Sequence, residues 1–201
     1  MNYTIIEDIG NKKEKHETKH KYFEEQGINL RREALPIGDY IFCTEKVQDV
    51  INRKEKRGIS LKKMDFMGSF EITVDTKKDI QEIILNICGK QHERFRDECI
   101  LATNNQIKLY VLVENKDNVQ NLNDLEYWIN PRIAKYEKIL EMHQKGKWKH
   151  IPEPKSPPTS GQTLAKAMRS MEEKYAVKFV FCHPEEAGEK IVELLSEKNP
   201  A

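Results

Sequence analysis

Apolar and polar residues alternate along several short stretches of this chain, which is the pattern of strands that bury one face. The clearest alternation occupies residues 70–75, where phenylalanine, isoleucine and valine stand at every second position. Residues 107–114 and 177–182 are almost continuously apolar, which is typical of strands covered on both faces. Strands are therefore predicted at residues 3–8, 28–35, 40–43, within 70–79, at 107–114 and at 177–182.

Apolar residues at helical spacing fill most of the intervals between these strands. The strongest stripe starts at Ile80 and returns to one face as far as Ala102, with Gly89 dividing it into two helices. The strand, helix and strand that follow one another from Phe70 to Val113 form a βαβ unit, whose crossover is expected to be right-handed. Further helices are predicted at residues 14–26, 121–128, 131–143, 163–175 and 185–195. This alternation of strands and helices predicts an α/β fold.

Two segments interrupt the alternation. Residues 45–68 combine a few apolar positions at helical spacing with a basic run at 53–57, and we expect a short helix and a mobile basic loop there. Residues 146–161 contain four prolines, which remove backbone donors and favour extended chain, so a linker is predicted. Within this linker, Trp148 is expected to fix the loop to the body of the protein, although a tryptophan between two lysines can also stack on a base.

Composition limits the classes of protein that the chain can represent. At 201 residues it is long enough for one sizeable core, and its net charge is only +1. Any contact with nucleic acid must therefore come from local basic patches such as residues 53–57 or 145–149. The four cysteines are scattered without C-x-x-C spacing, which argues against zinc knuckles and disulfides. No apolar run approaches the ~18 residues that span a bilayer, so we expect a cytoplasmic protein that does not enter the membrane.

Charged residues follow the apolar part of the strand within 70–79. Asp75 and Lys77 stand two positions apart and therefore project on the same side, where the strand ends. Asp39 follows a glycine at the start of another predicted strand, and it can supply a second acid. Two carboxylates that converge on a hard cation beside a lysine form the minimum arrangement for metal-assisted phosphodiester hydrolysis. A structural ion pair between Asp75 and Lys77 fits the spacing alone equally well.

The first predicted helix carries its own candidate residues. His16 and His20 lie one helical turn apart, which is the spacing of a two-histidine metal site. Because no third ligand of the zinc-hydrolase type accompanies them, a pair that lies on the surface or contacts phosphate is preferred over a metal site. The residues predicted to contact nucleic acid are Lys15, His16 and Lys19 on this helix, together with Arg94 on the helix after Gly89.

Five stretches of the chain are distinctive when taken together: LPIGDY (Leu35–Tyr40), VDTKKD (Val74–Asp79), HERFR (His92–Arg96), the strand at 107–114 and KYAVKFVFCHP (Lys174–Pro184). Together they resemble the XPF-type nuclease domain of the PD-(D/E)xK superfamily, in the small stand-alone form carried by phages and prophages. The resemblance implies a restriction-endonuclease-like core, with a central mixed sheet flanked by helices. It also implies a single nuclease-like domain over residues 1–201, with insertions at 45–68 and 115–160.

The same resemblance assigns roles in a catalytic site that contains Mg²⁺ or Mn²⁺. Asp39, Asp75 and Lys77 are then the catalytic residues, and the lysine positions or activates the attacking water. DNA is the implied substrate, and pairing of two nuclease domains into a homodimer is a further expectation. The implied metal ligands are Asp8 on the first strand, with Glu7 as the alternative, Asp39, Asp75 and the carbonyl of Thr76.

The sequence departs from the family pattern at three places. The first strand continues after Asp8 as Ile-Gly-Asn and lacks the usual arginine and glutamate, while Asp75-Thr76-Lys77 replaces Glu-Arg-Lys. The helical Arg-x-x-x-Gln ends in glutamate at position 98.

Two hypotheses about function follow from the resemblance and these departures. The first is an endonuclease acting on branched or flapped DNA in phage replication or recombination. The second is a binding module on the same fold whose site has decayed; a restriction-like or packaging nuclease would differ from the first only in substrate.

Overall fold

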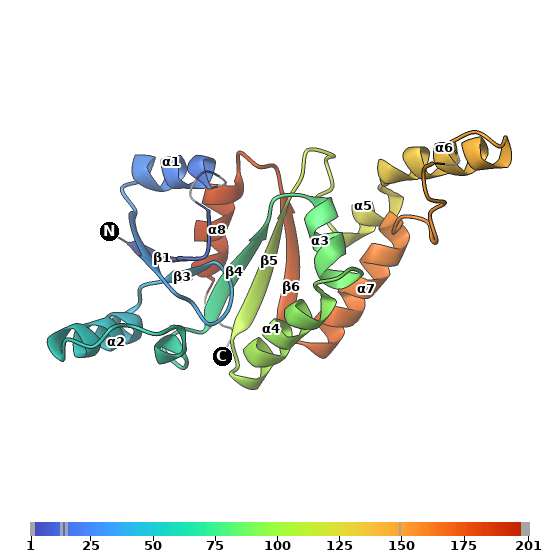
Figure 1. Ribbon diagram of the computed structural model, residues 1–201. Coiled ribbons are helices and arrows are strands. Elements are labelled where there is room, and N and C mark those ends of the chain that lie inside the picture. Colours follow the sequence, from blue (N-terminus) through green and yellow to red (C-terminus); the bar gives the residue numbers. More distant parts are fainter. Residues whose placement is uncertain (1–2, 13, 15, 149, 198–201) are drawn as a thin grey trace.

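A six-stranded mixed sheet forms the centre of the computed structural model, which describes residues 3–12, 14, 16–148 and 150–197 (Figure 1). The strand order is β2-β1-β3-β4-β5-β6. The strands are β1 (Thr4–Asp8), β2 (Asn29–Glu33), β3 (Tyr40–Phe42), β4 (Ile72–Lys77), β5 (Lys108–Glu114) and β6 (Val177–Cys182).

Strand directions determine which residues meet at one edge of the sheet. β4, β5 and β6 are parallel, and Lys77 of β4 lies opposite Val113 of β5. β3 runs antiparallel to both β4 and β1, so β1 and β4 point the same way. The ends of β1, β4 and β5 therefore meet at one edge, together with the start of β3.

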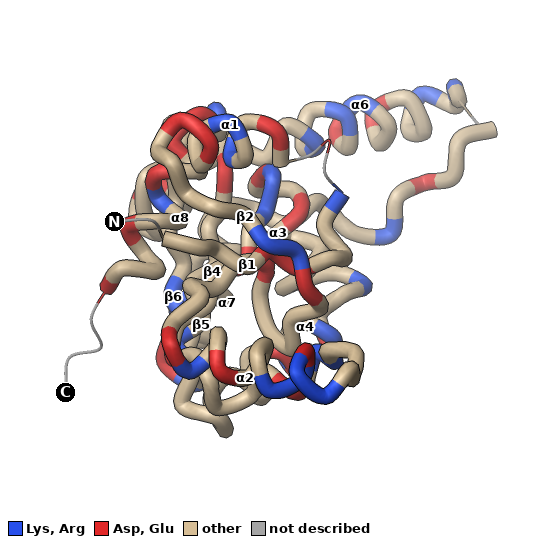
Figure 2. The backbone as a smooth tube through the Cα atoms, turned by 90° about the vertical axis from the view of Figure 1, so that its left-hand side faces the viewer, with Lys and Arg blue, Asp and Glu red and all other residues tan. Residues whose placement is uncertain are grey.

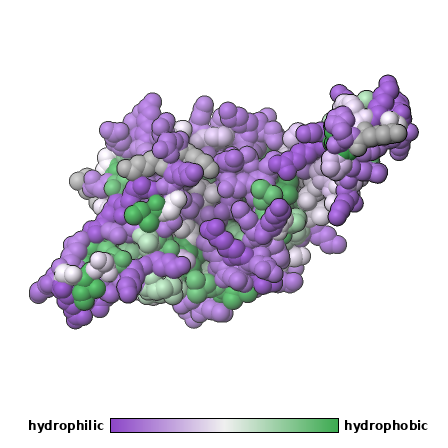
Figure 3. Space-filling view, in the orientation of Figure 1, coloured by the Kyte–Doolittle hydropathy of each residue, from purple (hydrophilic) through white to green (hydrophobic). Residues whose placement is uncertain are grey.

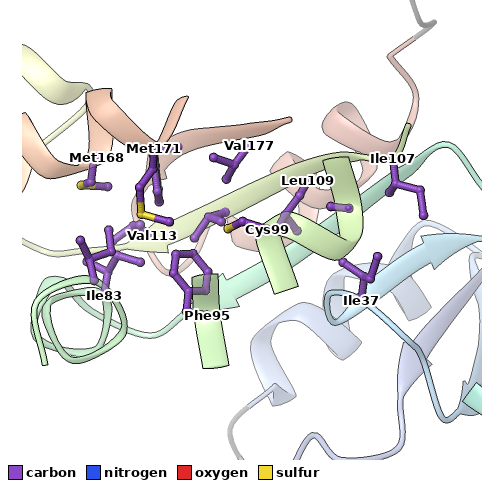
Figure 4. Packing of buried hydrophobic residues seen from close by; sticks show 14 of the residues in the cluster. Ile37, Ile83, Phe95, Cys99, Ile107, Leu109, Val113, Met168, Met171 and Val177 are labelled. Carbon is purple, nitrogen blue, oxygen red and sulfur yellow. The ribbon is translucent and has the colours of Figure 1, made fainter. Parts of the chain in front are cut away.

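Helices cover both faces of the sheet and bury two apolar clusters against it. On one face, α1 and α8 contact each other and pack Phe23 and Ile191 onto the strands. The opposite face is covered mainly by α3, α4 and α7, and Figure 4 shows Ile83, Phe95 and Met168 from these three helices in that cluster. The helices are α1 (Glu17–Glu25), α2 (Glu45–Lys56), α3 (Ile80–Ile87), α4 (His92–Asn104), α5 (Leu122–Tyr127), α6 (Arg132–Gln144), α7 (Gly161–Lys174) and α8 (Ala187–Leu195), with a 3₁₀ turn, η2 (Lys63–Phe66).

The predicted α/β fold, with a central mixed sheet flanked by helices, is confirmed. All six strands occur within two or three residues of the predicted positions. Five of them carry a clear apolar pattern, whereas β2 (Asn-Leu-Arg-Arg-Glu) alternates only weakly. The predicted break near Gly89 also occurs: α3 ends at Ile87 and α4 begins at His92. The surface in the view of Figure 3 is mostly hydrophilic, as a charged content of 33% requires.

The segment 45–68 differs from its prediction. Most of the basic run at 53–57 belongs to α2, which continues to Lys56, instead of forming a loop. Val47 and Ile51 of this helix and Phe66 of η2 are fully buried in the larger apolar cluster, and this burial extends the helix beyond the expected length. The segment is therefore packed onto the core.

Residues 115–160 contain two helices with different environments. α5 packs against α7, whereas none of the residues of α6 is buried. The predicted linker at 146–161 has no helix or strand in its described part before Gly161, where α7 begins. Trp148 lies with its ring 5.7 Å from Nζ of Lys138, so the indole contacts α6. Among the residues that the structure describes, no helix is both long and apolar enough to cross a bilayer.

Candidate active site

A cleft of about 780 Å³ opens at the edge of the sheet where β1, β4 and β5 end and β3 begins. The helices α3 and α4 contribute to its walls, and residues of α1 reach it from the other side. The structure brings into this one cleft the three residues predicted to be catalytic, although Asp39 is distant in sequence from Asp75 and Lys77. Among the charged residues that line the cleft are Asp8, Asp39, Asp75, Lys77, Arg94 and Glu98.

The turn before β3 places Asp39 at the cleft. Gly38 has a φ of +68°, and a Cβ on it would lie 2.2 Å from Oγ1 of the buried Thr73. The backbone N–H of Asp39 donates to the carbonyl of Val74 (2.8 Å), and the carbonyl of Asp39 accepts from the N–H of Asp8 (2.7 Å). These bonds attach the turn to both neighbouring strands, so Asp39 is held where β4 ends.

The carboxylate of Asp39 is bound to the β4 backbone. Its Oδ2 accepts hydrogen bonds from the backbone N–H of Thr76 (2.8 Å) and from the hydroxyl of the same residue (2.6 Å). Thr76 was predicted to offer its carbonyl to a metal; the structure assigns its N–H and hydroxyl to orienting Asp39. These two hydrogen bonds hold the Asp39 carboxylate beside Thr76, the residue that follows Asp75 on β4.

Asp75 and Lys77 form a buried ion pair, with 2.5 Å between Oδ2 and Nζ and side chains that are 7% and 11% exposed. Burial, with the nearby carboxylates of Asp39 and Glu98, outweighs the lowering effect of Lys77 and raises the pKa of Asp75 to about 8. Burial opposes the charge of Lys77, but the carboxylates of Asp75, Asp39 and Glu98 outweigh it and raise the pKa of the lysine. The cleft thus gathers more carboxylates than one lysine neutralises, which favours a bound cation.

Two residues of α4 flank this pair. Glu98 accepts a hydrogen bond from the backbone N–H of Gly38 (2.8 Å), so α4 supports the turn that carries Asp39. Sequence reasoning missed this role because the only signal was a one-turn spacing from Arg94, which usually means a surface ion pair. Arg94 itself is exposed on the wall of the cleft, where a phosphate can reach it.

Asp8 lines the cleft but is engaged in the turn that follows β1. Its Oδ1 accepts from the N–H of Leu35 (2.9 Å) and its Oδ2 from the N–H of Gly10 (3.0 Å). Arg32 of β2 donates to the carbonyls of Ile9 and Asn11 in the same turn. Arg32 therefore holds the segment that follows Asp8 in place. The family pattern has an arginine within this segment, and this sequence lacks it.

Glu7, the alternative first-strand acid, lies outside the cleft and is fully buried. It accepts a hydrogen bond from the hydroxyl of Tyr40 (3.0 Å) and contacts His20 (3.0 Å) and Arg32 (2.9 Å). Adjacent strand residues point to opposite faces of a sheet, so of these two acids Asp8 lines the cleft and Glu7 does not.

The candidate DNA contacts at the start of α1 are largely buried where the structure describes them, although His16 and Lys19 line the cleft. His16 is buried and its Nδ1 lies 2.6 Å from the hydroxyl of Tyr40, while burial and Lys19 lower its pKa. Lys19 is 4% exposed, and its Nζ lies 2.5 Å from Glu114 at the end of β5. Packing of α1 onto the sheet turns these side chains inward, which corrects the expectation of a surface pair of histidines. Lys15 lies outside the described residues.

The residues present fit a small hard cation. No group of three or more histidines, cysteines or acids is arranged to hold a metal among the described residues, but Mg²⁺ commonly binds one or two carboxylates, with water and substrate phosphate supplying the rest. Oδ2 of Asp75 is buried and accepts no hydrogen bond of acceptable geometry in the described part of the chain. This oxygen lies 2.5 Å from Nζ of Lys77. The carboxylates of Asp39 and Asp75 are therefore suitable oxygen ligands for a divalent cation.

Gly38→Ala is expected to destabilise the protein by about 2–5 kcal/mol. Left-handed backbone costs a residue with a Cβ roughly 1–2 kcal/mol, and overpacking against Thr73 adds about 1–3 kcal/mol. Gly27→Ala is the matched control, because Gly27 has a φ of +66° with nothing within 4 Å of the added Cβ. Chemical denaturation measures both variants, and equal losses would contradict the close contact at Thr73.

A comparison with protein families gives one match, to the ERCC4 domain, over residues 11–194. A search of curated protein sequences found no match. The family match covers most of the chain and agrees with the restriction-endonuclease-like sheet and with the resemblance to XPF-type nuclease domains found in the sequence. It supports an endonuclease, a hydrolase that acts on DNA. The chain therefore belongs to the ERCC4 domain family.

Proposed function

We propose that this protein is a Mg²⁺- or Mn²⁺-dependent DNA endonuclease whose active site is the cleft at the end of β4. The observation that carries the proposal is the convergence of Asp39 and the Asp75–Lys77 pair in that cleft. Asp39 is distant in sequence from Asp75 and Lys77, yet the three side chains meet in one cleft at the edge of the sheet. The chain itself belongs to a family of DNA nuclease domains. A purely structural ion pair between Asp75 and Lys77 would not require Asp39 to be held beside it by Thr76.

The carboxylates of Asp39 and Asp75 would hold the cation, with Asp8 and the carbonyl of Thr76 as further oxygen donors. A bound divalent cation would offset charge on the scissile phosphate and acidify a water molecule. Thr76 keeps the Asp39 carboxylate oriented, and Glu98 keeps the turn that carries it in place. The site is in this way assembled before substrate binds.

Lys77 orients the attacking water and stabilises negative charge that develops on the phosphate. Its side chain is positioned for this role by Asp75 and by the ring of Phe95, whose centroid lies 5.7 Å from Nζ. Arg94, exposed on the wall of the cleft, binds a neighbouring phosphate of the DNA backbone.

The substrate that we propose is branched or flapped DNA, processed in phage replication or recombination. We further propose that the chain is one nuclease-like domain, with residues 45–68 and 115–160 as insertions. In this proposal the protein works in the cytoplasm and pairs with a second copy.

The test is incubation of the purified protein with labelled single-stranded, duplex, flap and four-way-junction DNA, in Mn²⁺ and in chelator. We expect cleavage only with the metal, and preferential cleavage of the flap or junction. Preferential cleavage of plain duplex would assign the protein to a restriction-like function instead, and metal-independent cleavage would contradict the proposed mechanism.

The competing function is a DNA-binding or partner-recruiting module whose nuclease site has decayed. The absence of an arginine and glutamate after Asp8 in the sequence favours it, as does the absence of a three-residue metal cluster from the described residues. DNA binding that persists in chelator, together with no cleavage of any DNA in the panel by Mg²⁺- or Mn²⁺-loaded protein, would support this module and refute the endonuclease.

A further inference from the structure

The helix α6 extends away from the body of the protein (Figure 1). None of its residues is buried, and the chain returns along it, with Trp148 against Lys138. We call α6 and the return segment, residues 131–158, the arm. In Figure 1, α6 and α1 both lie beyond the upper end of the sheet, so the arm leaves from the end that carries the cleft.

One buried side chain holds both ends of the arm. Asn130 is 1% exposed, and its Nδ2 donates to the carbonyl of Thr159 (2.8 Å). Its Oδ1 accepts from Nε2 of Gln81 on α3 (2.9 Å) and from the N–H of Arg132 (3.0 Å). The next residue of α3, Glu82, lines the cleft. The base of the arm is therefore fixed to the helix that forms one wall of the cleft.

The arm has an excess of positive charge that the rest of the chain does not share. Residues 131–158 contain seven lysines and arginines against three glutamates, a net charge of +4, whereas the whole chain carries +1. The remainder of the chain is thus negative by three charges. A projection with this excess of positive charge is electrostatically complementary to a polyanion such as the DNA backbone.

The lysines and the apolar residues of α6 lie on different sides of the helix. At 100° per residue, Lys135, Lys138 and Lys145 fall on one side. Ile133, Tyr136 and Leu140 fall on the other side and are half-buried. Figure 2 shows basic positions along α6 from a second direction. The return segment contacts the basic side at Lys138, through Trp148. Lys135 and Lys145 on the same side remain exposed, the latter beside Glu141, and can be reached by a ligand.

We propose that the arm binds the phosphate backbone of duplex DNA that extends out of the cleft. The inference rests on the proposed function of the cleft, and it specifies a substrate with a double-stranded portion on the α3 side. A helix of this length spans ~20 Å, which corresponds to about six base pairs of DNA. Lysines at helical spacing bind phosphates without reading base sequence, so the arm lengthens the footprint without adding specificity.

The test is a variant in which Lys135, Lys145 and Lys147 are all changed to alanine. These three side chains are exposed, and Lys138 is kept so that its contact with Trp148 survives. Binding of labelled duplex is measured by fluorescence anisotropy in chelator over a series of salt concentrations. We expect affinity to fall roughly tenfold to a hundredfold, and the slope of log K against log salt to become shallower by about one for each phosphate that the arm no longer neutralises. A hydroxyl-radical footprint should shorten by about six base pairs on one side.

The matched control removes three exposed lysines near the amino-terminal ends of β4 and β6, as Lys46→Ala, Lys174→Ala and Lys178→Ala. It changes the net charge equally at the opposite end of the sheet from the cleft. An equal loss of affinity in both variants, or an unchanged footprint in the arm variant, would overturn the inference. Because binding is measured without metal, failure of the arm is separable from failure of the active site, which would appear as absence of cleavage by the unmodified protein.

Discussion

Lys77→Ala should reduce Mn²⁺-dependent DNA cleavage by on the order of 10³-fold, while DNA binding by the folded variant is largely retained. Because Lys77 is one partner of a buried ion pair, the variant should also be less stable, so cleavage is compared at a temperature where circular dichroism shows both proteins to be folded. Loss of a positioned group that stabilises transition-state charge typically costs about 10²–10³-fold, and in this proposal Lys77 also orients the attacking water. Binding should survive, because Arg94 and the arm contact the DNA independently of this lysine. The measurement is single-turnover cleavage of the best substrate from the DNA panel, with enzyme in excess.

The control for this prediction is Lys78→Ala, which removes the same side chain from the next position. Lys78 is exposed at the cleft just after β4 ends, and the ion pair with Asp75 is made by Lys77. Its loss should leave the rate of the chemical step nearly unchanged and weaken binding at most modestly. If Lys77→Ala cleaves as fast as the unmodified protein, Lys77 forms only a structural pair with Asp75.

Lys19→Met should lower the free energy of unfolding by about 3–5 kcal/mol, the cost of removing one partner of a buried ion pair. Lys19 and Glu114 are 4% and 9% exposed and lie 2.5 Å apart, joining α1 to the end of β5. Methionine fills similar volume but leaves the Glu114 carboxylate buried without its ammonium. Chemical denaturation measures the loss.

The loss should also depend on pH. Burial raises the pKa of Glu114, against the lowering effect of Lys19, and Glu82 and Asp39 raise it further. The folded protein therefore holds this proton more tightly than the unfolded chain, so stability falls as pH rises from the ordinary glutamate pKa of 4.5 through the raised value. Removing Lys19 raises the pKa of Glu114 further and widens the pH interval over which stability falls. Lys19→Met should accordingly lose less stability in mildly acidic than in mildly alkaline buffer.

The control on the same helix is Lys21→Met. Lys21 is 76% exposed and pairs with Glu25 one turn away, and such surface pairs contribute only about 0.3–0.5 kcal/mol. A loss for Lys19→Met as small as that for Lys21→Met would show that the buried pair contributes little to folding.

The sheet could be predicted from the sequence because its strands carry strong patterns. The alternation through β4 and the apolar runs of β5 and β6 allow only one assignment of the side chains to the two faces of the sheet. Asp75 and Lys77 could be placed at one edge because side chains two positions apart on a strand project together. The residues offered Asp39 as a second acid, and the resemblance to a known family implied that it binds metal. The antiparallel pairing of β3 with β4, which brings Asp39 to this edge, comes from the structure.

Other parts of the site depend on packing between distant elements, which leaves little trace in the sequence. Lys19 was predicted to contact nucleic acid, and its buried pairing with Glu114 was missed because Glu114 is far away along the chain. Glu98 read as a surface acid, since nothing local indicates that it accepts a bond from Gly38. The basic run at 53–57 was predicted to be a loop. Most of it is helical because apolar residues earlier in α2 are buried in one cluster with η2, a contact that the local sequence does not reveal.

The most direct test of the account is Mn²⁺-dependent cleavage by Asp75→Asn beside the unmodified protein, on the same labelled DNA. Asparagine preserves the shape of the side chain and removes the charge that would hold the cation. The account predicts rapid cleavage by the unmodified protein in Mn²⁺, none in chelator, and no detectable cleavage by Asp75→Asn at a concentration where it still binds the DNA. Undiminished cleavage by Asp75→Asn would contradict the assignment of the cleft as the catalytic site.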